Sequence, residues 1–172
     1  MSAKMPHQAQ AKPLYTVEQR LRRDRSVWTL VQGVLAPLQF LVFLVSLALV
    51  LRYLASGVGE TAAALSVVVK TLALYAIMIT GAIWEKVVFG RYLFAPAFFW
   101  EDAFSMLVLA LHTAYLAALG FGWLGARGLM LLALAAYASY AINATQFVLK
   151  LRAARLQSAR ATGVGAQLEG AR

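Results

Sequence analysis

The sequence predicts an all-α membrane protein, built as a bundle of four transmembrane helices. Hydrophobic residues make up 62% of the 172 residues, and the mean hydropathy is +0.70, whereas a water-soluble domain is about 45–50% apolar. Charged residues make up 13% of the chain and are clustered between long uncharged stretches. A lipid bilayer accommodates this much apolar surface, and water does not.

Four stretches are long enough to cross the membrane, since a helix needs about 20 mostly apolar residues to span the hydrocarbon core. They are Val27–Leu51, Ala62–Trp84, Ala103–Trp123 and Gly128–Leu149. The turn-forming segment SGVGE at residues 56–60 separates the first two, and GARG at residues 125–128 separates the last two. Short connections of this kind join antiparallel neighbouring helices.

The chain therefore divides into three parts. Residues 1–26 form a basic N-terminal tail, residues 27–150 form the four-span domain, and residues 151–172 form a basic, partly disordered C-terminal tail. From Ser158 onward the chain is rich in Ala, Gly and Gln and has no apolar period, which predicts disorder.

The distribution of Lys and Arg predicts the orientation in the membrane. Both tails and the connection between the second and third spans share one side, and they hold thirteen of the 16 basic residues. The short loops on the other side hold Arg52 and Arg127, and Lys70 lies within the second span. Because basic residues are enriched on the cytoplasmic side, we expect a multi-pass protein of the bacterial inner membrane with both termini in the cytoplasm.

The composition excludes several kinds of site. Without cysteine the chain has no disulfide, Cys-ligated zinc, iron–sulfur cluster or c-type haem attachment. Of the two histidines, His7 lies in the tail, so His112 provides at most a single axial ligand, and we expect no cofactor. The net charge of +9 does not indicate a nucleic-acid partner, because the basic residues lie mostly in the tails rather than on a folded face.

Three carboxylates flank the connection between the second and third spans. Glu85 ends the second span, and Glu101 and Asp102 open the third, so antiparallel packing brings them together at the cytoplasmic interface. In one alternative, Lys86 and Arg91 neutralise the three carboxylates, and the N-terminus of the third span also favours the negative charges of Glu101 and Asp102. In the other alternative, the three carboxylates form a catalytic set. In the catalytic case, burial and neighbouring charge keep one of them protonated.

Two further ionisable residues lie within the spans. His112 follows Glu101 by eleven residues, so the two share a helix face and His112 lies about 15 Å deeper. It is a candidate catalytic residue, a candidate ligand or an interhelical hydrogen-bonding residue. Lys70 lies a short way into the second span, and we expect its long side chain to extend to the external surface.

Polar residues at helical spacing predict which faces of the first and fourth spans point inward. The first span carries Gln32, Gln39 and Ser46, and the fourth carries Ser139, Asn143 and Gln146. Most residues of this kind hydrogen-bond between helices. Asn143 is also a candidate contact of a bound ligand.

The connection GRYLFAPAFFWED at residues 90–102 is rich in aromatic residues. Aromatic residues anchor helices at membrane interfaces. Alternatively, they form a flat apolar platform for a large planar ligand whose polar edge faces a basic residue. In that case the candidate contacts are Lys86, Arg91, Tyr92, Phe98 and Trp100.

Three long strings carry a specific resemblance. They are YTVEQRLRRDRSVWTLVQGVLAPLQFLVFLVSL at residues 15–47, VVKTLALYAIMITGAIWEKVVFGRYLFAPAFFWEDAFSMLVLALHTAYL at residues 68–116 and AAYASYAINATQFVLKLR at residues 135–152. Together they resemble the 2-vinyl bacteriochlorophyllide hydratase family. The resemblance implies a membrane-bound hydro-lyase of bacteriochlorophyll biosynthesis, which adds water across the C3-vinyl group of a chlorophyllide to give a 3-(1-hydroxyethyl) group.

The resemblance carries over no catalytic residue. It implies a tetrapyrrole substrate, whose magnesium is the only metal we expect, and it makes neighbouring enzymes of the pigment pathway candidate partners besides the lipid bilayer. Hydration of a vinyl group needs a proton donor, a water and surroundings that tolerate positive charge. Glu85, Glu101 and Asp102 are the candidates for these roles, with His112 as a proton relay or a contact of the magnesium.

These inferences give a specific hypothesis and a rival. In the hypothesis the tetrapyrrole lies between the second and third spans, its propionate faces Arg91 or Lys86, and Glu101 or Glu85 is the acid. In the rival the protein is a non-enzymatic scaffold or carrier that passes chlorophyll-type pigments between enzymes. Product formation by the purified protein distinguishes the two.

Overall fold

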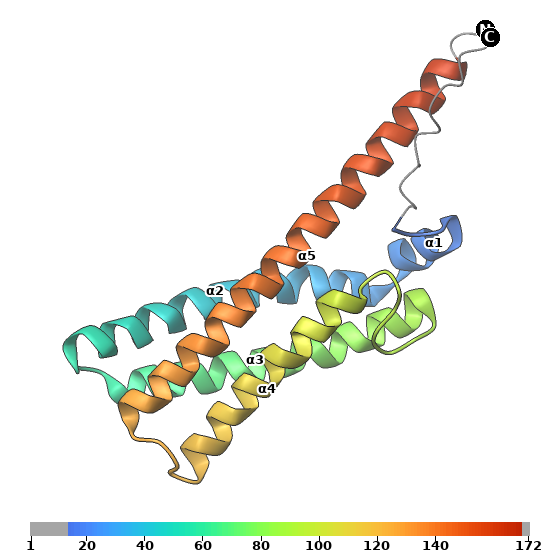
Figure 1. The fold of residues 1–172 in the computed structure, drawn as a ribbon. Coiled ribbons are helices and arrows are strands. Elements are labelled where there is room, and N and C mark those ends of the chain that lie inside the picture. The colour runs from blue at the N-terminus through green and yellow to red at the C-terminus, as the bar shows by residue number, and fades with distance from the viewer. Residues whose placement is uncertain (1–13, 170–172) are drawn as a thin grey trace, which may run out of the picture.

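The computed structural model describes residues 14–169, and the surroundings of side chains for residues 14–156. This part of the chain consists of five helices (Figure 1): α1 (Val17–Arg25), α2 (Val27–Ser56), α3 (Glu60–Phe89), α4 (Phe99–Gly120) and α5 (Ala126–Glu169). Within it, four segments are long and apolar enough to cross a membrane: Val27–Ser56, Glu60–Phe89, Phe99–Gly120 and Ala126–Leu156. The predicted all-α fold with four candidate spans is confirmed.

The helices extend a few residues beyond the apolar stretches that predicted them. α2 and α3 end where Gly57 (φ 70°) and Gly90 (φ 82°) adopt the left-handed conformation, which glycine does without steric cost. As a result Glu85 lies inside α3, about one turn from its end, and Glu101 and Asp102 lie in the first turn of α4. All three carboxylates are therefore held on rigid helices.

Both tails contain more helix than the sequence predicted. α1 lies within the N-terminal tail, where Thr16 and Gln19 form a capping box. α5 continues to Glu169, through the segment from Ser158 that the sequence predicted to be disordered. Ala, Leu, Arg and Gln favour helix and no proline interrupts them, so the helix propagates out of the span. Residues 1–13 and 170–172 lie outside the described part.

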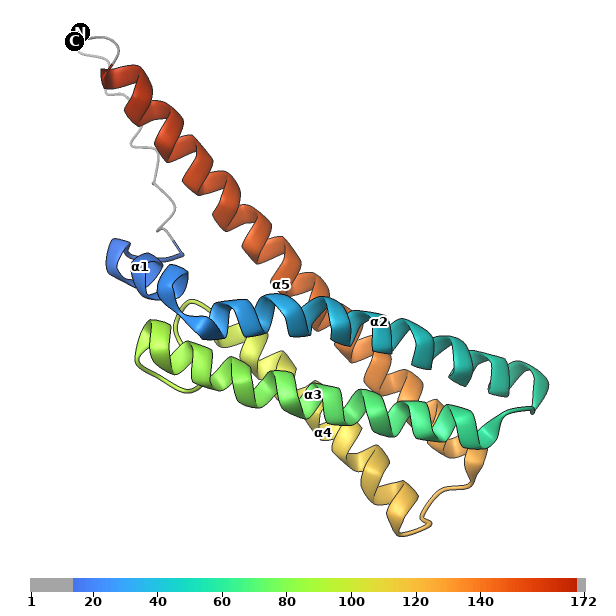
Figure 2. The same cartoon turned by 180° about the vertical axis from the view of Figure 1, so that it is seen from behind.

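The helices form two antiparallel pairs, as the short connections predicted. α2 lies beside α3, and α4 lies beside α5, in the views from both sides (Figures 1 and 2). Buried side chains from these four helices form the core: Val50, Val67, Val108, Met130, Ala133 and Tyr137. From the loop that joins them, α3 and α4 diverge toward the opposite end of the bundle.

The predicted inward faces of α2 and α5 are confirmed. Their buried polar residues are Gln39, Ser46, Ser139 and Asn143. Ser46 Oγ lies 2.7 Å from Ser66 Oγ of α3 and also hydrogen-bonds to the hydroxyl of Tyr137 on α5. Asn143 Nδ2 donates to Ser105 Oγ of α4 over 2.7 Å. Hydrogen bonds therefore link both helix pairs through the interior.

The sequence predicted that the side chain of Lys70 extends to the surface, and the structure contradicts this prediction. Its side chain is fully buried, and Nζ lies 3.8 Å from the centroid of the Tyr140 ring. Lys70 follows Ala63 and Val67 at helical spacing, so its side chain starts on the buried face of α3. The face of the tyrosine ring then takes the place of water around the ammonium group.

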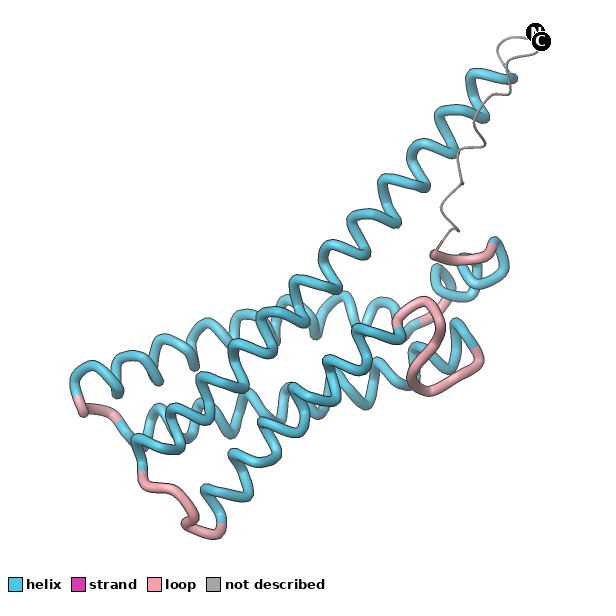
Figure 3. The backbone as a smooth tube through the Cα atoms, viewed as in Figure 1, coloured by secondary structure: helices cyan, strands magenta, loops and turns pink. Residues whose placement is uncertain are grey.

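One end of the bundle carries all the long extramembrane elements. α1, the α3–α4 loop and the extension of α5 lie at this end, and the two short turns lie at the other (Figures 1 and 3). Because the chain has four candidate spans, the segments before the first span, between the second and third spans and after the fourth span all lie at the same end. The candidate carboxylates therefore lie at the same end as the basic tails.

Candidate functional site

Glu85, Glu101 and Asp102 gather where the loop joins α3 to α4. Their residues are only 5%, 8% and 4% exposed. Gly90 stops α3, and α4 begins at Phe99, so the chain reverses direction within residues 90–98 (Figure 3). This short reversal is why carboxylates from the end of one helix and the start of the next share one buried position.

Two backbone N–H groups of the loop at residues 90–98 donate hydrogen bonds to two of the carboxylates. The N–H of Phe94 donates to Asp102 Oδ2 over 2.7 Å, and the N–H of Ala95 donates to Glu85 Oε2 over 3.3 Å. Phe94 has φ 57°, a left-handed conformation that is uncommon for a bulky side chain. The two hydrogen bonds hold the loop in this strained conformation. Sequence reasoning missed these backbone donors, which no residue type signals.

The carboxyl groups of Glu85 and Asp102 form the centre of the site. They are close enough to act on each other electrostatically, and they accept the backbone N–H groups of two adjacent loop residues. Two neighbouring buried carboxyl groups favour a state in which one of them holds a proton, because two negative charges close together repel each other. A pair that shares a proton can donate it and take it back, which is the basis of general acid–base catalysis.

Glu101 has a separate partner. Its Oε2 lies 2.6 Å from Nζ of Lys150 on α5, and the two side chains are 11% and 26% exposed. The Lys150 ammonium also lies 5.0 Å from the centroid of the Phe98 ring. The sequence analysis missed Lys150 as this partner. The predicted topology already placed it at the same end as Glu101, and that was the available signal.

Lys86 and Arg91 do not neutralise the carboxylates, which corrects the first alternative drawn from the sequence. Lys86 Nζ donates to the carbonyl of Gly90 over 3.1 Å and lies 5.2 Å from the centroid of the Tyr92 ring. Arg91 is exposed in the loop. Within residues 14–156 neither forms an ion pair with an acidic residue. Two positive charges therefore remain beside the site.

The aromatic residues form two groups instead of the predicted flat platform. Phe98 is 2% exposed and packs with Tyr15, Trp84, Phe89 and Phe147. Tyr92 and Trp100 are 61% and 72% exposed. The Phe94 and Phe99 rings meet at 53°, and the Phe99 and Trp100 rings at 86°. Phe98 fills space beneath the loop, so only the exposed rings are available to a ligand at the surface.

Tyr15 closes the buried aromatic group from the N-terminal side. Its ring stacks on Phe89 at a centroid distance of 5.8 Å, and the guanidinium carbon of Arg23 lies 4.8 Å from its centroid. Burial raises the pKa of the Tyr15 hydroxyl, although the neighbouring Arg23 opposes this shift. The segment before α1 is therefore packed against the buried aromatic residues at this end of the bundle.

Asn143 and His112 lie deeper in the bundle. Asn143 bonds to Ser105, which lies about one turn beyond Asp102 on α4, so it belongs to the layer next to the carboxylates. His112 follows Asp102 by ten residues and is fully buried. Its Nδ1 lies 2.8 Å from the carbonyl oxygen of Val108. The structure thus brings Glu85, Glu101 and Asp102 together and leaves His112 apart from them.

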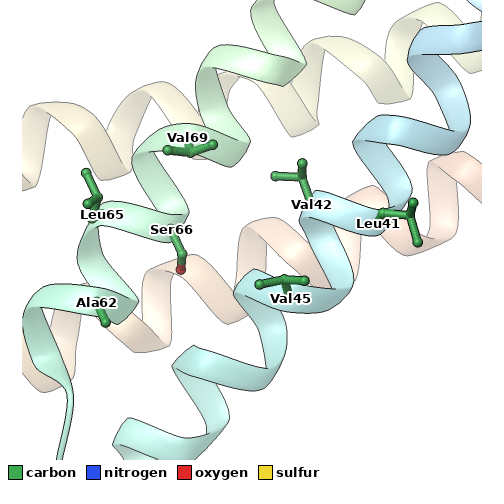
Figure 4. Close-up of a pocket in the computed structure, with 7 residues that line it drawn as sticks. All are labelled: Leu41, Val42, Val45, Ala62, Leu65, Ser66 and Val69. Carbon is green, nitrogen blue, oxygen red and sulfur yellow. The ribbon is translucent and has the colours of Figure 1, made fainter.

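A groove between α2 and α3 offers a contrasting environment (Figure 4). It has a volume of about 460 Å³ and is lined by Leu41, Val42, Val45, Ala62, Leu65, Ser66 and Val69. The hydroxyl of Ser66 is occupied by Ser46 and by the carbonyl of Ala63. No titratable side chain lines this groove, so it does not support acid–base chemistry.

The fold and the site define a multi-pass membrane protein with a buried cluster of carboxylates at one end of its bundle. A family model described as 2-vinyl bacteriochlorophyllide hydratase matches residues 15–153. The 2-vinyl bacteriochlorophyllide hydratase of Rhodobacter capsulatus is 64% identical over 154 residues, which cover 90% of each chain. That of Cereibacter sphaeroides is 68% identical over 144 residues, covering 83% of this chain and 89% of its own. No solved structure matches the chain.

The chain therefore belongs to the 2-vinyl bacteriochlorophyllide hydratase family. It is a hydratase, a carbon–oxygen lyase, of bacteriochlorophyll biosynthesis. The resemblance found in the sequence is confirmed over almost the same range of residues.

Proposed function

We propose that Glu85 and Asp102 form the acid–base centre that adds water across the C3-vinyl group of a chlorophyllide. The observation that carries the proposal is a pair of neighbouring buried carboxyl groups that accept hydrogen bonds from the adjacent backbone N–H groups of Phe94 and Ala95. The names of the two relatives describe hydratases of a 2-vinyl bacteriochlorophyllide. A vinyl hydratase requires a proton donor that can be regenerated, and this pair supplies one.

The reaction needs one proton transfer in each direction. The acid gives its proton to the terminal vinyl carbon, and the π electrons of the vinyl group form the new C–H bond. The carbon beside the ring becomes a cation, which the macrocycle delocalises. Water attacks this carbon to form the C–O bond, and its excess proton returns to the carboxylate pair. Negative charge nearby stabilises the cation, which is electrostatic catalysis in a buried site.

We assign the proton to Glu85 and the negative charge to Asp102. Asp102 accepts the shorter backbone hydrogen bond, 2.7 Å against 3.3 Å for Glu85. It also lies in the first turn of α4, where the helix dipole favours an anion. Glu101, which is paired with Lys150, is a positioning residue in this scheme and not the acid.

The substrate lies between α3 and α4, against the loop at residues 90–98. Its propionate faces Arg91 or Lys86, whose charges are not paired with acidic residues of the described chain. Tyr92 and Trp100 are exposed beside them and contact the ring edge. Since the carboxyl groups are almost fully buried, the loop at residues 90–98 must move to admit the substrate. The strained conformation at Phe94, which costs about 1–3 kcal/mol, favours that movement.

We further propose that the site faces the cytoplasm from a bacterial inner membrane. The end of the bundle that carries the site also carries most of the basic residues, and basic residues are enriched on the cytoplasmic side. Neighbouring enzymes of the pigment pathway would then collect the product from this side. Because the chain lacks cysteine, a single introduced cysteine is the only thiol that a maleimide can label, and its labelling shows on which side of the membrane that residue lies. In inside-out vesicles, a membrane-impermeant maleimide should label Arg91→Cys and leave Arg127→Cys unlabelled, and the opposite pattern would refute this orientation.

The function is tested by a pigment assay. The purified protein in detergent is incubated with a 3-vinyl chlorophyllide, and the pigment is analysed by mass spectrometry. We expect a gain of one water that depends on the protein. Unchanged pigment that co-purifies with the protein would overturn the proposed site and would support a carrier.

A further inference from the structure

Helix α1 turns an apolar face away from the bundle. Val17 is 80% exposed and Leu21 is 52% exposed, and their spacing of four residues places them on one side of the helix. None of the nine residues of α1 is buried. Apolar side chains at this spacing normally pack against a core. The described chain provides no such cover for these two, so another surface must provide it.

The opposite side of α1 is fixed to the bundle, which defines the direction of the apolar face. Arg23 lies about half a turn around the helix from Leu21, and its guanidinium carbon lies 4.8 Å from the centroid of the Tyr15 ring. The carbonyl oxygen of Arg23 accepts a hydrogen bond from Thr29 Oγ1 of α2 over 2.6 Å. Thr29 Oγ1 in turn accepts the indole N–H of Trp84 of α3 over 2.9 Å. These contacts keep the arginine on the inner side of α1 and the apolar residues on the outer side.

Two arginines flank the apolar face and have no acidic partner. Both acidic residues of the helix, Glu18 and Asp24, already pair with other arginines of α1. Arg20 and Arg25 are exposed and form no ion pair within residues 14–156. At 3.6 residues per turn they lie on either side of the apolar face. Apolar residues bordered by cations are typical of helices that lie in the membrane interface.

The position of α1 in the chain places this face close to the membrane surface. α1 ends at Arg25, and the first candidate span begins at Val27. Between them Ser26 has an extended backbone (φ −80°, ψ 127°), so α1 does not continue the axis of α2 and sits beside its end (Figures 1 and 2). The nine residues of α1 rise only about 13 Å. The helix therefore stays within reach of the lipid headgroups.

We propose that α1 is an interfacial helix that binds anionic phospholipids. Val17 and Leu21 insert between the headgroups, and the guanidinium groups of Arg20 and Arg25 bind lipid phosphates. A guanidinium group forms paired, charge-assisted hydrogen bonds with a phosphate, and basic segments next to a span are attracted to anionic lipids. The inference does not depend on which carboxyl group is the catalytic acid.

The size of the face favours lipid over a protein partner. A stable protein interface buries about 800 Å² on each side, and two apolar side chains on a helix of nine residues cover much less. A bilayer needs no such area, because the spans already hold α1 beside it. Weak contacts of a few side chains are then sufficient to bind the headgroups.

The first test measures the lipid preference of the full chain in detergent. Phosphatidylglycerol and phosphatidylcholine are added in equal amounts, and the bound lipids are identified by native mass spectrometry. We expect the wild type to prefer phosphatidylglycerol. Arg20→Gln/Arg25→Gln should lower this preference by at least about tenfold, since each basic residue near an anionic surface contributes roughly a fivefold gain in affinity.

The matched control removes two exposed charges from the opposite end of the bundle. Arg52 lies near the end of α2 and Arg127 at the start of α5, and both are exposed. Arg52→Gln/Arg127→Gln should keep the wild-type preference. An unchanged preference in the α1 variant would overturn the proposal. An equal loss in the α1 variant and in the control would overturn it as well, because the effect would then reflect net charge.

The second test locates the apolar face while Arg20 and Arg25 stay unchanged. Leu21→Cys and Arg22→Cys each carry a nitroxide spin label, in nanodiscs of phosphatidylcholine mixed with phosphatidylglycerol. Oxygen, which concentrates in lipid, should relax the label of Leu21→Cys more than a water-soluble nickel chelate does, and the label of Arg22→Cys should show the reverse. Equal access of the chelate to both labels would refute insertion. A label of Leu21→Cys that neither reagent reaches would show that protein covers this face, and would replace lipid by a protein partner.

Discussion

Glu85→Gln should lower kcat for vinyl hydration by about 10²–10⁴-fold, the range that a general acid contributes. The amide has nearly the shape of the acid and still accepts the hydrogen bond from the N–H of Ala95. It has no acidic proton to give to the vinyl carbon. The loss should therefore fall on kcat, with little change in binding of the chlorophyllide. Initial rates of product formation in detergent, followed by chromatography of the pigments, measure this effect.

Glu60→Gln is the matched control, because Glu60 lies on the same helix and is exposed at the opposite end of the bundle. It should retain the rate of the wild type. Wild-type kcat in Glu85→Gln would exclude Glu85 as the acid. The proton would then have to come from Asp102 or Glu101, and Asp102→Asn and Glu101→Gln would be compared next.

Lys150→Met should lower the free energy of unfolding by about 2 kcal/mol. Removing one partner of a fully buried ion pair costs about 3–5 kcal/mol, and the 26% exposure of the Lys150 side chain reduces that cost. The methionine keeps most of the aliphatic chain, so the loss reports the charge. Glu101 would be left with its carboxylate largely out of water and unpaired. Unfolding of the purified protein in mixed micelles, followed by circular dichroism, measures the change.

The double variant Lys150→Met/Glu101→Gln tests the cause. Removing the stranded carboxylate should recover more than half of the lost stability, because a neutral amide is less costly to bury than an unpaired charge. Arg152→Met serves as a control for loss of one positive charge, since Arg152 is exposed on the same helix. Equal destabilisation in the single and double variants would show that the ion pair is not what stabilises this end of the bundle.

Several features could be predicted from the sequence because they depend on properties of nearby residues. A run of about 20 apolar residues defines a span wherever it lies, and all four spans were found. The inward faces of α2 and α5 followed from the spacing of residues such as Gln39, Ser46 and Asn143. The proximity of Glu85 and Asp102 followed from the short connection between their helices. Membership of the hydratase family also came from the sequence, because long strings of residues carry it.

The tertiary structure alone decided which side chains meet across the bundle. Glu101 pairs with Lys150, 49 residues away, instead of with Lys86 or Arg91 close by in the chain. Lys70 turns inward to the ring of Tyr140, and Phe98 packs beneath the loop instead of joining Trp100 at the surface. These choices depend on how each helix is rotated against its neighbours. That rotation is set by the packing of all the helices together, and no local stretch of sequence contains it.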